Sequence, residues 1–121
     1  MVLISDVEFE QLIERAIAEL PQNIQDSLQN VVFVVEDESE GRQFLGLYHG
    51  VPATKRGTNY TMVLPDKITI YKRVIEDQAE SVEELPGLVR RVVWHEIGRH
   101  LGFDEQEIQR LEKKWEMERK V

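Results

Sequence analysis

Apolar residues recur three and four positions apart in the first twenty residues, a spacing typical of an amphipathic helix. Ser5 and Glu8 precede this stripe in the arrangement of a capping box, and Ile4 stands at the outer staple position. Pro21 ends the pattern because a proline cannot continue a helix. The sequence therefore predicts an N-terminal helix whose buried stripe is Phe9, Leu12, Ile13, Ala16, Ile17 and Leu20.

The middle of the chain has the composition of β-strands. A short polar helix or turn over 22–30 leads into the first β-branched run, which predicts a buried strand. Pro65 and Asp66 are expected to form the turn before the last strand, and the loop at 51–57 is long enough to carry function. The candidate strands lie at 31–35, 45–50, 60–64 and 68–71.

The C-terminal third is predicted to be helical. Ser81 and Glu84 form a second capping box, and the helix is expected to run to about Leu101. Gly102 suits the left-handed position that closes a helix. A last helix follows, with Asp104 and Glu107 as its cap and Phe103 and Ile108 as its staple, and its apolar stripe is Ile108, Leu111 and Trp115. Together the elements predict an α+β fold in one domain over 1–121, with a small sheet packed against helices.

Composition narrows the range of functions. The chain of 121 residues has no cysteine, which excludes disulfides, thiolate zinc sites and cysteine nucleophiles. Its 23 acidic and 15 basic residues give a net charge of −8, which repels phosphate backbones and argues against nucleic-acid binding. The N-terminus lacks a basic segment followed by an apolar stretch, and no long apolar run follows. We therefore expect a cytoplasmic protein without membrane association.

The helix predicted to end near Leu101 carries candidate chemistry. In a zinc-binding H-E-x-x-H helix, two histidines one turn apart hold the ion, and the glutamate takes a proton from zinc-bound water. His95 and Glu96 fit the first two positions, but Arg99 stands where the second histidine belongs. A guanidinium stays protonated and offers no lone pair, so Arg99 repels a metal ion.

Two other histidines are candidate substitutes for the missing ligand. His100 lies about 140° around the helix from His95, so both can reach one ion only through a π-bulge. A helical pair between His100 and Glu96, four residues apart, is the simpler expectation. His49 ends a predicted strand, where a remote ligand and an ordinary surface histidine are both open readings.

The motif continues beyond the helix. Gly102 ends the helix and turns the chain, so that Glu105, three residues later, can face a metal. With this spacing the chain resembles the minimal zincin-like metallopeptidase family, small bacterial and archaeal proteins with an H-E-x-x-H-x-x-G-x-x-[D/E] motif. The resemblance extends over residues 34–38, 45–48, the loop at 50–54, 64–71 and 92–98. It implies a minimal zincin-like fold, a small mixed sheet packed against an N-terminal helix and an active-site helix, with a further helix at the C-terminus.

The resemblance also implies a ligand set. It places His95 and Glu105 at zinc positions and Glu96 at the general-base position, with zinc as cofactor and a peptide or protein as substrate. Because Arg99 replaces a ligand, the leading expectation is weak or no zinc binding and little peptidase activity, with Arg99 paired to Glu96 or Glu105. An active zinc peptidase that recruits His100 or His49 is the alternative. A third reading is a non-catalytic module that binds a peptide or a partner protein.

Overall fold

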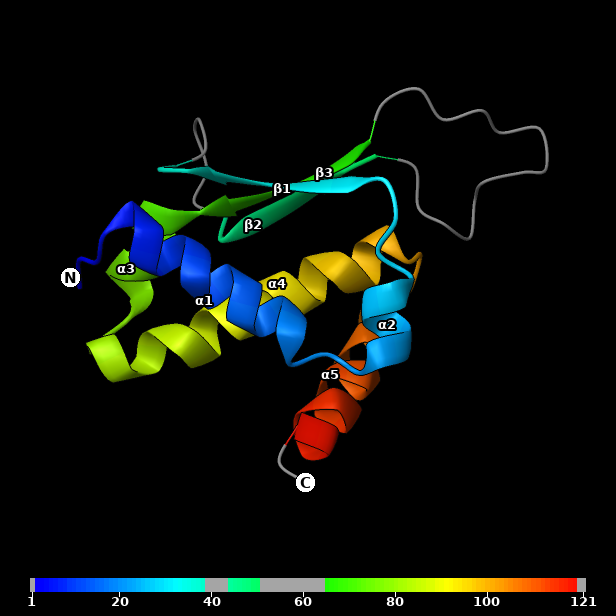
Figure 1. The fold of residues 1–121 in the computed structure, drawn as a ribbon. Coiled ribbons are helices and arrows are strands. Elements are labelled where there is room, and N and C mark those ends of the chain that lie inside the picture. Colours follow the sequence, from blue (N-terminus) through cyan, green and yellow to red (C-terminus); the bar gives the residue numbers. More distant parts are fainter. Residues whose placement is uncertain (1, 39–43, 51–64, 120–121) are drawn as a thin grey trace.

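The computed structural model describes residues 2–38, 44–50 and 65–119. Helices and a small sheet form separate layers in this part of the chain (Figure 1). The predicted strand at 60–64 and the loop at 51–57 lie outside the described residues. In order, the elements are α1 (Asp6–Ala18), α2 (Gln22–Asp26), β1 (Val31–Glu36), β2 (Gly46–His49), β3 (Asp66–Tyr71), α3 (Lys72–Gln78), a 3₁₀ turn (Val82–Glu84), α4 (Leu85–His100) and α5 (Glu105–Arg119).

The sheet is mixed, as predicted. Its strand order is β1-β3-β2, with β3 parallel to β1 and antiparallel to β2. Both α1 and α4 lie beneath it, with α4 packed against β2 and β3 and α1 packed against α4, and α5 extends away from the sheet (Figure 1). The predicted α+β fold class is therefore confirmed, including the N-terminal, motif-bearing and C-terminal helices.

The core lies between the sheet and the first layer of helices. Ile68 and Ile70 of β3 are fully buried, as are Phe9 of α1 and Ile97 of α4. The indole Nε1 of Trp94 donates a 2.8 Å hydrogen bond to the carbonyl oxygen of Ala16 and so ties α4 to α1. Burial on three elements at once fixes the position of α4, which carries the motif.

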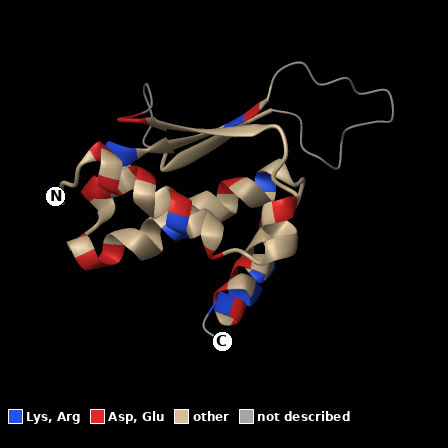
Figure 2. Cartoon of the chain, in the orientation of Figure 1, with Lys and Arg blue, Asp and Glu red and all other residues tan. Residues whose placement is uncertain are grey.

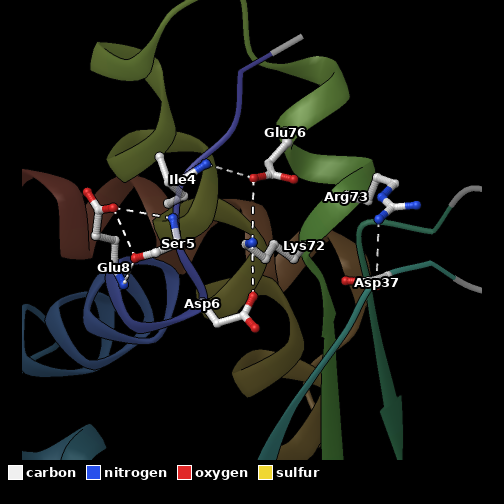
Figure 3. A network of polar contacts seen from close by, with 8 residues as sticks. All are labelled: Ile4, Ser5, Asp6, Glu8, Asp37, Lys72, Arg73 and Glu76. Carbon is white, nitrogen blue, oxygen red and sulfur yellow. Dashed lines mark hydrogen bonds and ion pairs between the residues drawn. The ribbon is translucent and has the colours of Figure 1, made fainter.

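Local capping signals were read correctly at two helices. Ser5 Oγ accepts from the Glu8 amide and Glu8 Oε1 from the Ser5 amide, so the first capping box is formed. Beside it, Glu76 of α3 accepts at Oε2 from the Ile4 amide at 3.0 Å, and Lys72 bridges Glu76 to Asp6 (Figure 3). These contacts fasten the N-terminal segment to α3.

Several sequence predictions were wrong in detail. β1 was expected to be buried, but it lies at an edge of the described sheet and Val32 is 43% exposed. Asp66 was expected in a turn, whereas it begins β3 and is fully buried. Ser81 forms no side-chain cap, because the Glu84 carboxylate accepts instead from the amide of Glu80, and α4 begins only at Leu85.

The helix α3 was not predicted at all. It follows β3 without a loop and has only seven residues, so no separate pattern marks it in the sequence. Charged residues are frequent on the helices and sparse on the strands (Figure 2), where the Lys, Arg, Asp and Glu residues are Glu36, Asp66 and Lys67. In the described part of the chain, no helix combines the length and apolar character needed to span a bilayer.

Candidate functional site

The motif-bearing helix lies directly against the edge strand β2. Gly46 makes this approach possible, because a Cβ there would stand 2.8 Å from Val92 Cγ1 and 3.2 Å from Glu96 Cγ. Real side chains do not tolerate the shorter contact without movement. Strand β2 therefore covers one side of Glu96, which is one of the polar groups of this site.

His95, the residue before Glu96 in α4, is half-buried and lies between two carboxylates of α5. Its Nε2 stands 3.4 Å from Glu105 Oε1, and its Nδ1 stands 3.7 Å from Glu112 Oε1. The contact with Glu112 raises the pKa of His95 above its ordinary 6.5, while burial opposes the shift and the charges of Glu96 and Glu105 add to it. His95 therefore favours the imidazolium form more than a free histidine does.

The connection between α4 and α5 brings Glu105 to His95. Gly102 has φ 94° and closes α4, as the sequence predicted. Asp104 then caps α5, since its Oδ1 accepts from the Glu107 amide at 2.8 Å and its own amide donates to Glu107. Gly98 lets α5 approach, because a Cβ there would lie 2.8 Å from Ile108 Cγ1. The predicted neighbourhood of His95 and Glu105 is thus present.

Glu96 is the most buried acid of this group, with 5% of its surface exposed. Burial raises its pKa, which His95, Arg99 and a hydrogen bond from the backbone of Tyr48 act to lower. Its Oε1 atom is buried and has no hydrogen-bond partner within the described part of the chain. A carboxylate oxygen left unpaired in the interior is unfavourable unless a ligand satisfies it.

A cavity of about 470 Å³ opens beside these side chains. Phe44, Leu88 and Val92 give it apolar walls, and His95, Glu96 and Glu112 give it polar ones. Apolar walls with a few convergent polar groups are typical of sites that bind small molecules or side chains. A second cavity, of about 660 Å³, lies between α4 and α5 on the side of Trp94 and Met117.

Arg99 does not join the cluster. Its side chain is exposed, and among the described residues no ion pair joins it to Glu96 or Glu105. The expectation that Arg99 pairs with these acids is therefore wrong. The physical reason is that His95 already lies between Glu105 and Glu112, while Arg99 acts on Glu96 only through its charge.

His100 faces the sheet and does not point toward His95. Its Nδ1 lies 2.8 Å from Asp66 Oδ2, and the same oxygen accepts a 2.8 Å hydrogen bond from the Tyr48 hydroxyl. The rings of Tyr48 and His100 meet edge to face at 5.9 Å. The predicted pairing of His100 with Glu96 is thus wrong, because a strand residue 34 positions away in the sequence is its partner.

His49 is exposed at the end of β2, opposite Lys67 of β3. In the described ranges, which include all three histidines, no three histidine or acidic side chains form a group that could hold a metal ion. His95 and Glu105 come together as predicted, while His100 and His49 do not join them.

The sequence reading missed Glu112 and Asp66. Glu112 lies seven residues after Glu105 and four after Ile108, on one face of α5, so its helical spacing was a usable signal. Asp66 had no such signal, because its partners Tyr48 and His100 come from β2 and α4.

Comparison with known proteins agrees with the motif. A family model described as zincin-like metallopeptidase matches residues 28–115, a range that contains the whole sheet and every motif position. No curated protein matches the chain.

Proposed function

The chain belongs to the zincin-like metallopeptidase family, and from this premise we propose that its zinc site is degenerate, with weak or no zinc binding and little peptidase activity. The cleft beside Glu96 then serves for binding and not for hydrolysis. The observation that carries the proposal is Arg99, which stands at the second ligand position of the motif.

The donors near His95 do not fit zinc. A catalytic zinc ion takes three protein ligands and a water molecule. His95 Nε2 and Glu105 Oε1, 3.4 Å apart, supply two donors. The side chain at the third position is a guanidinium, which has no lone pair to give and carries a positive charge. Arg99 is exposed and leaves His95 and Glu105 without a third ligand from the motif.

The test is to restore the missing ligand. In Arg99→His, an imidazole stands one turn after His95, so His95, the new ring and Glu105 supply three ligands. We expect zinc to raise the melting temperature of this variant and to leave that of the parent protein unchanged, since an ion that binds only the native state stabilises it. Arg110→His, at an exposed position of α5, is the matched control for adding a histidine. Zinc stabilisation of the parent as large as that of Arg99→His would contradict the proposal, whereas no greater stabilisation of Arg99→His than of Arg110→His would contradict the assignment of Glu105 as a ligand.

A rearranged zinc site is the alternative, in which His100 or His49 joins His95 and Glu105 and Glu96 is the general base. The bond between His100 and Asp66 argues against it, because ligation would break a buried 2.8 Å contact. His49 would have to reach across from the exposed end of β2. Zinc-dependent peptide cleavage that Glu96→Gln abolishes would favour this alternative.

A non-catalytic module that binds a peptide is the second alternative, and it is compatible with a degenerate zinc site. The cavity supports it, because its apolar walls and unpaired carboxylate oxygens remain useful without a metal. Binding of peptides without cleavage, measured by calorimetry, distinguishes a module of this kind from a peptidase.

A further inference from the structure

Three carboxylates line the cavity beside α4. Glu96, Glu105 and Glu112 all line it, and two of their oxygens, Glu96 Oε1 and Glu112 Oε1, are buried without a hydrogen-bond partner in the described ranges. Only 5% of Glu96 is exposed, so water does not solvate its carboxylate as it does a surface acid. The site therefore has more acceptors than the protein has donors for them.

Positive charge within the cluster is limited. His95 is shared between Glu105 and Glu112, at 3.4 and 3.7 Å, and donates no hydrogen bond to Glu96 Oε1. Arg99 is exposed, and Arg91 lies at the cavity with its side chain exposed to solvent. What the site lacks is a compact cation with several N–H donors.

The walls of the cavity indicate what carries that cation. Phe44, which is 38% exposed, lines the cavity with Leu88 and Val92, so an apolar surface leads toward the carboxylates. A lysine side chain combines a flexible alkyl stem with three ammonium donors, whereas the planar guanidinium of arginine favours bidentate pairing with two coplanar acceptors.

We propose that this cavity binds a primary alkylammonium group, namely the side chain of a lysine in a peptide. The ammonium lies between Glu96 and Glu112, and the stem lies along Phe44, Leu88 and Val92. The inference rests on the proposed function in one respect, because it requires that no zinc ion occupies the space between His95 and Glu105.

The experiment uses the whole chain after dialysis against a chelator, followed by removal of the chelator. Backbone amide shifts are recorded by NMR during titration with N-acetyl-lysinamide, and separately with N-acetyl-norleucinamide, which has the stem but no ammonium. We expect the lysine probe to bind at least about tenfold more tightly and to shift amides of α4 and α5 around the cavity. Equal binding of the two probes would overturn the proposal.

Variants locate the ammonium. Glu96→Gln keeps the shape of the side chain and removes a buried charge, so the fold should tolerate it, and we expect it to weaken the lysine probe at least about fivefold. Glu118→Gln removes a charge from an exposed position of α5 and should leave binding unchanged. An unaltered affinity in Glu96→Gln would contradict the assignment.

A third probe, butylammonium, separates a peptide ligand from a free amine. Tighter binding of N-acetyl-lysinamide supports the peptide, and equal binding would overturn that part of the proposal and assign a free amine. Zinc content before dialysis is measured on the same protein. Bound zinc would contradict the proposed function, whereas metal-free protein that does not distinguish lysine from norleucine contradicts only this inference.

Discussion

The two histidines of α4 have opposite surroundings although they are five residues apart. His100 is 2% exposed and fixed at 2.8 Å by an aspartate that also holds a tyrosine. His95 is 31% exposed at the cavity, and its carboxylate neighbours stand at the longer distances of 3.4 and 3.7 Å. One histidine fastens the helix to the sheet, and the other faces a space that a ligand can enter.

Helix geometry explains why one cannot replace the other. Five residues rotate a helix by about 140° beyond one turn, so His95 and His100 face different directions. His100 follows position 99 in the sequence, but its side chain does not face the same direction as His95. Under the proposed function, His100 therefore does not replace a histidine at position 99, because it already contacts Asp66.

The comparison predicts the largest loss of stability at the buried contact between His100 and Asp66. Asp66→Ala leaves His100 and the Tyr48 hydroxyl without their shared acceptor, and we expect it to lower the free energy of unfolding by about 3 kcal/mol. Glu105→Ala, which removes a neighbour of His95, should cost less than about 1 kcal/mol, since the Glu105 side chain is 66% exposed. Urea denaturation of both variants measures the difference. Equal losses would show that the surroundings of His95 and His100 do not differ in the way described.

The contact between β2 and α4 should give the next effect. Gly46→Ala places a methyl group 2.8 Å from Val92 Cγ1, and we expect a loss of about 1–2 kcal/mol as the strand or helix moves. Gly87→Ala is the control within α4, because the nearest atom to its new Cβ is the end of Arg90 at 3.7 Å. Thermal unfolding of both variants provides the test, and a neutral Gly46→Ala would argue against the close approach that buries Glu96.

Several parts of this arrangement could be predicted from the sequence, and the reason is that their signals are local. The caps at Ser5 and Asp104 and the turn at Gly102 depend on residues within a few positions of one another. The partner of His100 depends instead on how β3 and α4 pack, so a rule based on helical spacing chose Glu96 wrongly. For Arg99, the sequence showed the loss of a ligand but not the direction of its side chain.

The smallest expected effect is the pH dependence of stability that the pair of His95 and Glu112 contributes. The folded-state pKa of His95 is raised, chiefly by Glu112, so the pair stabilises the fold below pH 6.5 and the stabilisation is lost as the pH rises through the folded-state value. Glu112→Gln should therefore cost about 0.5 kcal/mol well below pH 6.5 and almost nothing well above it. Melting curves of the parent and the variant, recorded well below and well above pH 6.5, test whether the loss of stability is larger at low pH. A larger loss at high pH would contradict the assigned pair.

Zinc content tests the central claim most directly, namely that Arg99 has removed the metal chemistry from a zincin-like site. The parent protein is purified without chelator, dialysed, and analysed for zinc per chain by elemental analysis. The account predicts far less than one zinc per chain and no change in melting temperature when zinc is added. One zinc per chain that survives dialysis and is lost in His95→Ala would contradict it.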